Sequence, residues 1–264
     1  MNKRKIWIFG DSYGTHLAND KLKITPWYWA YSLGKRLGCT EYKNFSQWGV
    51  GNDFIHYVID LHSEEISPED YVVVVSSSAS REWLIKDQPT VSNYFVNDLH
   101  KFVNKDQYNA IISYVKHLQF QKKTELNFKK MLGSIHYMTD KFNWNSIIIP
   151  GFEHNGFPVS HKYSVNGSLF DVCYNEFKTT KDQEWFYNHF SKHIDRRAGH
   201  LIKNNHKILE DKLYNTFTNN AVLDLTTDFE EKIISKNNLD FLENQMSEYN
   251  MSVDGGVTAF IPTY

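Results

Sequence analysis

The sequence predicts an α/β fold, a three-layer sandwich in which helices cover both faces of a mostly parallel β-sheet. Short runs of apolar residues alternate along the chain with longer stretches whose apolar residues recur at helical spacing. Strands that alternate with helices in this way form βαβ units, whose strands lie parallel. The chain has 264 residues, 41 % of them apolar, which is enough for one well-buried domain or at most two small ones.

Six segments are strand candidates. Residues 71–75 are the clearest, because a β-branched run without alternation is typical of a strand that is covered on both faces. Residues 147–149 form a similar run, which Pro150 and Gly151 end. The predicted strands are residues 6–9, 41–45, 71–75, 147–149, 169–172 and 221–225.

Helical patterns fill the stretches around these strands. The first of them ends at Gly38, and the longest, residues 97–139, predicts one or two long helices inserted into the α/β core. The predicted helices are residues 27–37, 54–61, 97–139, 184–193, 200–217 and 229–246.

Composition and charge argue against several classes of protein. The formal net charge is −2, so no basic excess draws the chain to nucleic acid. Cys39 and Cys173 are too few for a disulfide framework and are expected to be reduced thiols. The apolar run that follows the basic residues 1–5 is too short for a signal peptide, and no run approaches the roughly 20 residues of a membrane helix. The expected location is the cytoplasm, and release by lysis or incorporation into a virus particle fits the same pattern.

Polar residues directly follow the first predicted strand. In parallel α/β sheets, a ligand binds beyond the carboxyl ends of the strands. Gly10, Asp11 and Ser12 stand at that point, where a tight turn exposes the Ser12 hydroxyl and places its backbone N–H near a helix start. Ser12 is therefore a candidate nucleophile, and a helix N-cap formed by Asp11, Ser12 or Thr15 is an equal alternative.

The segment after the second strand contains hydrogen-bond donors. Gly49 and Gly51 allow the backbone to approach a ligand closely, and Asn52 adds an amide donor. These are the parts of an oxyanion hole, which donates hydrogen bonds where negative charge develops. A plain loop in which Asn52 or Asp53 caps the next helix explains the same residues.

Serines and one arginine follow the third strand, at residues 76–82. Arg81 suits two roles equally, either binding a substrate carboxylate or forming a structural ion pair with Glu82 or Asp53. Ser78 belongs to the same hydroxyl-rich segment and is a candidate substrate contact.

Aromatic and polar residues flank these segments. Residues 152–181 follow the fourth strand, where substrate loops normally lie, and they contain His154. Trp48, Trp83 and Phe152 suit stacking on a sugar or an acyl chain and are equally good core residues.

His200 stands where a late predicted helix begins. A serine hydroxyl needs a general base at neutral pH, and histidine is the best-matched base. Asp195 is an acid that can hold the tautomer of such a histidine. His200 and His206 lack the His-x-x-x-His spacing of a metal site, and we expect neither a metal nor a cofactor.

Taken together, these segments resemble the SGNH (GDSL-type) hydrolase superfamily. Gly10-Asp11-Ser12 is similar to the first block of the family, which implies that Ser12 is the nucleophile. Residues 44–52 resemble the second block, where a glycine N–H lines the oxyanion hole, and Gly49 is the matching glycine here.

The segment 199–209 is similar to the last block, where the base histidine precedes a terminal helix. That register implies His200 as the base rather than His193 or His206. The resemblance also implies a five-stranded, flavodoxin-like sheet in a single domain, with a core at about residues 5–218 and a C-terminal extension at 219–264. The substrate contacts that we predict are Asp11, Ser78, Arg81 and His154.

The sequence departs from the family pattern in two places. The family usually has Gly-x-Asn-Asp after the third strand, and its Asn completes the oxyanion hole; here either Asn52 or a serine of residues 76–80 takes that role. The family also places an Asp three residues before the base, where this chain has Arg197. Asp195 substitutes, or a Ser–His dyad relies on a backbone carbonyl. The Ser-x-Ser-Arg pattern looks like that of divergent members, often viral ones such as those of phage.

The resemblance implies a serine ester hydrolase that works through an acyl-enzyme on Ser12. The expected substrate is a small-molecule or carbohydrate ester, first an O-acetylated carbohydrate and next a lipid or small acyl ester, with no nucleic-acid or membrane partner. Two alternatives remain. One is a catalytically inactive binding or structural module on the same fold, and the other is a sugar O-acyltransferase that uses the same Ser and His.

Overall fold

A four-stranded parallel sheet forms the centre of the structure, a computed structural model that describes residues 4–15, 28–89, 99–152, 162–179, 201, 203–230 and 232–234. The strands are β1 (Lys5–Gly10), β2 (Glu41–Asn44), β3 (Tyr71–Ser76) and β4 (Asn145–Pro150), in the order β2-β1-β3-β4. All three neighbouring pairs are parallel, which confirms the predicted α/β class. Within the described residues this sheet has four strands, not the predicted five.

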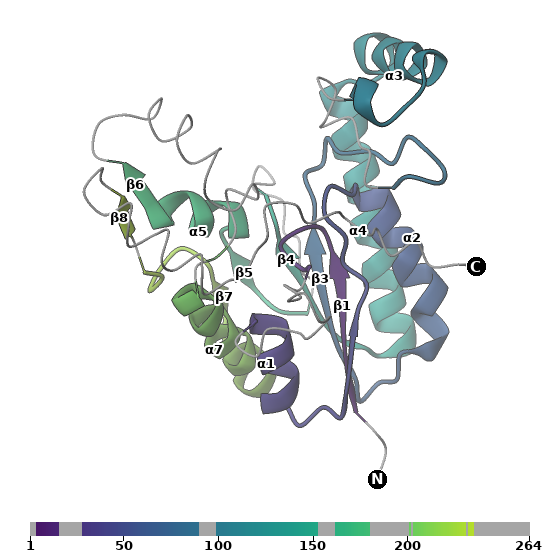
Figure 1. Cartoon of the computed structure of the whole chain (residues 1–264). Coiled ribbons are helices and arrows are strands. Elements are labelled where there is room, and N and C mark those ends of the chain that lie inside the picture. The colour runs from purple at the N-terminus through teal and green to yellow at the C-terminus, as the bar shows by residue number, and fades with distance from the viewer. Residues whose placement is uncertain are drawn as a thin grey trace.

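Helices cover both faces of this sheet (Figure 1). On one face lie α1 (Trp29–Arg36), α5 (Leu169–Glu176) and α7 (Lys203–Asn219), and on the other lie α2 (Asn52–His62) and α4 (Gln121–Phe142). Alternate residues of each strand serve the two cores, because successive side chains of a strand point to opposite faces. Ile6 and Ile8 pack with α1 and α7, whereas Trp7 and Phe9 pack with α2 and α4.

Two helices occupy most of the predicted long helical stretch. The 3₁₀ turn Leu99–Lys101 leads into α3 (Lys105–His117), whose capping box joins Asn104 and Gln107, and α4 follows after a short break. The α3 helix has its own small core with Leu99 and extends away from the sheet (Figure 1). None of the described helices combines the length and the hydropathy that crossing a membrane requires.

Three predicted elements differ in the structure. Residues 169–172 are helical in α5, not a strand, because the Ser168 hydroxyl caps this helix by accepting from the Asp171 N–H at 3.1 Å. Residues 221–225 contain the short strand β7 (Leu223–Asp224), which pairs with β5 (Val165–Asn166) outside the main sheet.

The third difference lies in the predicted helix 229–246. Its described part contains β8 (Lys232–Ile234), which pairs in parallel with β6 (Phe177–Thr179). The rest of that helix, and all of the predicted helix 184–193, lie outside the described residues. Another short 3₁₀ turn, Ser63–Glu65, follows α2.

A buried carboxylate fixes the amino-terminal end of β1. Asp70 accepts hydrogen bonds from the Lys5 N–H at 2.7 Å, the Trp7 indole N–H at 2.9 Å and the Ser67 N–H at 3.1 Å. We expect Asp70→Ala to lower the free energy of unfolding by about 2–4 kcal/mol, because it removes the acceptor of one buried and two partly buried donors. Urea unfolding measures this change. The exposed Asp60→Ala is the control, with an expected change within about 0.5 kcal/mol.

Candidate active site

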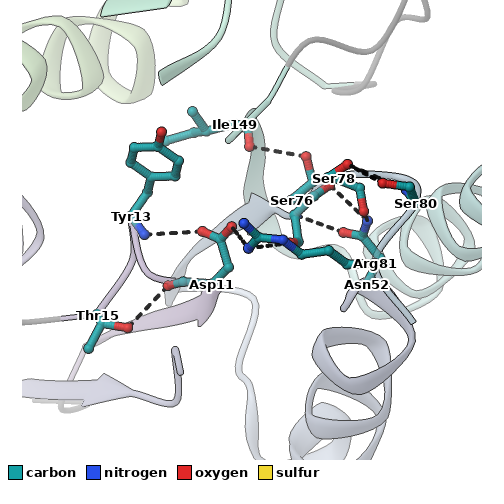
Figure 2. A network of polar contacts seen from close by, with 10 residues as sticks. Asp11, Tyr13, Thr15, Asn52, Ser76, Ser78, Ser80, Arg81 and Ile149 are labelled. Atoms are coloured by element: carbon teal, nitrogen blue, oxygen red, sulfur yellow. Dashed lines mark hydrogen bonds and ion pairs between the residues drawn. The ribbon is translucent and has the colours of Figure 1, made fainter. Parts of the chain in front are cut away.

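The turn after β1 places Ser12 at the carboxyl edge of the sheet. Asp11 shapes this turn from both its side chain and its backbone: its Oδ1 accepts from the Tyr13 N–H at 3.1 Å (Figure 2), and its carbonyl accepts from the Gly14 N–H at 3.0 Å. The Thr15 hydroxyl donates to the same carbonyl at 3.2 Å. Ser12 itself is partly exposed, while Asp11 and Tyr13 are buried. The turn therefore presents the serine and hides its neighbours.

The segment after β2 runs alongside this turn. The Phe45 N–H donates to the Ile8 carbonyl at 2.8 Å, and the Gln47 N–H donates to the Gly10 carbonyl at 3.0 Å. Gly49 then takes a φ of 75°, a left-handed conformation that favours glycine. These bonds bring the predicted oxyanion segment to the same edge of the sheet as Ser12.

Asn52 anchors the turn after β3. Its Nδ2 donates to the carbonyls of Ser77 at 2.8 Å and Ser78 at 3.1 Å, and its Oδ1 accepts from the Ser77 N–H at 2.8 Å. Both amide hydrogens thus have acceptors within the protein. A role for Asn52 as an oxyanion donor would require those bonds to change, and it stays a prediction.

Arg81 lies buried at the end of this turn, where it forms an ion pair with Asp11. Its Nη1 lies 3.4 Å from Asp11 Oδ2 and 3.3 Å from the Ser77 hydroxyl, as Figure 2 shows for the Asp11 pair. Only 8 % of the Arg81 side chain is exposed and none of Asp11. The predicted alternative of a structural ion pair therefore fits Arg81, with Asp11 as the partner.

Burial and the guanidinium act on the Asp11 carboxyl in opposite directions. Desolvation raises the pKa of Asp11 from its ordinary 3.8 to about 6, and the charge of Arg81, the Tyr13 N–H and the Ser77 hydroxyl each lower it. The carboxylate is consequently ionised at neutral pH, with Arg81 as a buried counter-charge.

The pair was missed in the sequence because it depends on strand order. Asp11 and Arg81 follow β1 and β3, which are neighbours in the sheet and pair Gly10 with Val75. The sequence signal that could have indicated this pair is that an acidic and a basic residue follow two strands of one parallel sheet.

The aromatic candidates divide between the site and the core. The Phe152 ring lies under the Arg81 guanidinium, 4.7 Å from ring centroid to Cζ, and against Tyr13 at 5.6 Å between centroids. Trp83 packs edge-on against Phe54 at 5.2 Å, on the side of the α2 and α4 core. Phe152 is thus an aromatic residue beside the Ser12 turn, and it also stacks on Phe170 and packs against the core of that face.

The other predicted substrate contact that the structure describes is Ser78. Its hydroxyl lies 2.9 Å from that of Ser80, which is exposed. Within the described residues, no group of three or more His, Cys, Asp or Glu side chains is arranged to hold a metal ion.

The predicted base and acid, His200 and Asp195, lie outside the described residues, as does His154. The residue after His200 is described: Leu201 is buried and belongs to the same core cluster as Tyr13. His206 is buried inside α7, with its ring 5.4 Å from that of Tyr28. Leu201, two residues before α7, therefore packs in the core on the same face of the sheet as Tyr13.

Ionisation of the buried Asp11 gives a testable pH dependence of stability. Since its folded-state pKa of about 6 exceeds the ordinary 3.8, the folded protein binds more protons than the unfolded chain between these values. Stability therefore falls as the pH rises through this window, by a few kcal/mol in total. We expect Asp11→Asn to lack this fall, and the difference between the two proteins in urea unfolding at pH 4 to 7 isolates it. Equal pH dependence in both proteins would contradict a raised pKa of Asp11 in the folded protein.

Comparisons with known proteins place bacterial esterases and lipases among similar structures. A phospholipase A1 from Streptomyces albidoflavus matches with a TM-score of 0.30 and 8 % identity, over 59 % of this chain and 64 % of that one. A lipolytic protein of the G-D-S-L family from Veillonella parvula gives 0.32 and 10 %, over 81 % and 98 %. A family two carbohydrate esterase from Clostridium thermocellum, solved in complex with cellohexaose, gives 0.34 and 12 %, over 83 % and 64 %.

The chain thus spans just under two thirds of the phospholipase and of the carbohydrate esterase. No protein-family model and no curated protein matches the sequence. These three structures are bacterial and give no support to a viral origin. Similarity at this level carries no argument about the reaction, which has to be argued from the residues of the site.

Proposed function

We propose that the protein is a serine ester hydrolase that works through an acyl-enzyme on Ser12. The observation that carries this proposal is the position of Ser12, partly exposed in the turn that directly follows β1, at the carboxyl edge of a parallel sheet. A buried, ionised Asp11 fixes that turn, and a segment with a left-handed glycine runs beside it.

The reaction proceeds in two acyl transfers. His200 removes the Ser12 proton as Oγ attacks the ester carbonyl, and the resulting imidazolium gives that proton to the departing alcohol oxygen. Water then attacks the acyl-enzyme, with His200 again taking a proton and returning it to Ser12 Oγ as the acid leaves. Asp195 orients His200 in this scheme.

Backbone donors hold the oxyanion in this proposal. The Ser12 N–H and the Gly49 N–H are the two donors, and loss of one such donor typically costs on the order of 10²–10³ in turnover. Asn52 would join them only after releasing the carbonyls of Ser77 and Ser78.

An O-acetyl group on a carbohydrate is the substrate that we propose first, which makes the protein a deacetylase. The partly exposed Phe152 is the aromatic residue that we propose to contact the sugar, and Ser78 and His154 are the proposed polar contacts. The whole chain is proposed to be a single domain, with an extension from residue 219.

Labelling with a fluorophosphonate probe tests the proposal. The probe is expected to modify the wild-type chain once, and peptide mapping should place the adduct on Ser12. Hydrolysis of 4-nitrophenyl acetate is expected in parallel. A chain that is neither labelled nor active on short-chain nitrophenyl esters is a binding module, and the hydrolase proposal then fails.

A further inference from the structure

We infer that Arg81 is a positioning residue for Ser12, because its guanidinium keeps the Asp11 carboxylate ionised and that carboxylate shapes the turn on which Ser12 stands. The inference rests on the proposed function, since only a reactive Ser12 gives the turn a kinetic readout. It replaces the substrate-binding roles that the sequence suggested for Asp11 and Arg81.

The backbone of Arg81 is held in place from several sides. The Arg81 N–H donates to the Ser78 carbonyl at 3.1 Å, and Asn52 fixes the same turn through Ser77 and Ser78. A Cβ at Gly51 would meet the Arg81 carbonyl at 2.6 Å, so the start of α2 packs directly on this backbone. Arg81 therefore reaches Asp11 from a rigid base rather than from a free loop.

The carboxylate transmits this position to the serine turn. Asp11 Oδ2 faces Arg81 Nη1 at 3.4 Å, while Oδ1 accepts from the Tyr13 N–H, the amide that follows Ser12. An ionised carboxylate can accept at both oxygens, whereas a protonated one presents a donor on one of them. Protonation of Asp11 therefore places an O–H donor next to the N–H donors of the guanidinium or of Tyr13, and this disturbs the turn.

The groups around the Asp11 carboxyl identify Arg81 as its counter-charge. From the turn after β3 come the guanidinium and the Ser77 hydroxyl, and from the β1 turn comes the Tyr13 N–H. The uncharged ring of Phe152, two residues after β4, lies against the guanidinium. Among the described residues, Arg81 is the one charged group that acts on this carboxyl. His200, the proposed base, is the second titrating group that the kinetics will report.

The pH dependence of the rate at which fluorophosphonate labels Ser12, measured from pH 5 to 9, tests this role. Wild type, Arg81→Lys and Arg81→Met are compared, and Asp87→Asn, which changes an exposed side chain six residues after Arg81, is the control. In Arg81→Met we expect the acidic limb of the profile to move to higher pH by about one unit or more, because the buried carboxyl loses its counter-charge. Arg81→Lys should keep the limb close to that of wild type.

Two results would overturn the inference while leaving the hydrolase proposal intact. One is a labelling rate in Arg81→Met that is lower by the same factor at every pH, which marks a merely structural role. The other is an acidic limb in the pH profile of Arg81→Lys that lies at as high a pH as that of Arg81→Met. Wild type that is unlabelled at every pH removes the proposed function instead, and this inference with it.

A second variant keeps the test valid if Arg81→Met does not fold. Asparagine at position 11 cannot titrate, so Asp11→Asn should label slowly at all pH values, with an acidic limb set by His200 alone. A wild-type labelling rate and profile in Asp11→Asn would overturn the inference.

Discussion

Ser12→Ala is expected to lower ester hydrolysis by at least about 10³-fold and to abolish fluorophosphonate labelling, because the acyl-enzyme cannot form without Oγ. Stability should change little, since the Ser12 side chain is partly exposed and the turn is held by Asp11 and Thr15. Initial rates on 4-nitrophenyl acetate, with urea unfolding of the same samples, measure both quantities.

Ser67→Ala is the matched control for this substitution. Ser67 is another partly exposed serine, next to the amino-terminal end of the sheet, and its hydroxyl donates to the Glu69 carboxylate at 2.7 Å. We expect its activity to stay within about two-fold of wild type, because a surface change away from the reacting atoms has little effect. Full activity in Ser12→Ala would place the nucleophile elsewhere and end the proposal for this turn.

The central sheet was predictable because its strands are locally unambiguous. Residues 71–75 and 147–149 are β-branched runs with no polar alternation, and the structure buries both within β3 and β4. β1 is also buried on both faces, because Ile6 and Ile8 lie in one core and Trp7 and Phe9 lie in the other. Wherever burial on both faces dictates the residue types, the sequence pattern identifies the element.

The prediction failed where tertiary context decides between two local preferences. Residues 169–172 contain Phe and Val, which favour strands, yet Ser168 caps a helix there and its hydroxyl bonds to Asp171 at 2.7 Å. The spacing Ser-x-x-Asp is a signal for a helix start, but the apolar residues of this segment led to the prediction of a strand. Residues 221–225 were predicted as a strand, but these residues alone could not show that β7 pairs with β5 outside the main sheet.

In the candidate site too, features set by local sequence were predictable and features set by tertiary contacts were not. The turn carrying Ser12 and the left-handed Gly49 follow from short local motifs, which a sequence displays directly. The ion pair of Asp11 with Arg81 joins residues 70 positions apart, and it requires that β1 and β3 be neighbours in the sheet. From the sequence, Glu82 and Asp53 were the partners considered for Arg81, because the strand order that places Asp11 beside it is not visible in the sequence.

His200→Ala is expected to reduce hydrolysis by about 10³-fold or more while leaving the fold intact, because Ser12 then lacks a base at neutral pH. The residue after His200, Leu201, is buried in the same core cluster as Tyr13, and α7 begins two residues later at Lys203. Residual activity should rise with pH as hydroxide replaces the missing base. Steady-state rates on 4-nitrophenyl acetate from pH 6 to 10 measure both effects.

His193→Ala is the matched control, since it removes a histidine seven positions earlier that the family register does not select. It should retain wild-type activity and its pH profile. His206 is a poor control, because it is buried against Tyr28 and its loss is expected to affect packing. Loss of activity in His193→Ala with activity retained in His200→Ala would reverse the assignment, and the base would then have to reach Ser12 from a segment earlier than the approach to α7.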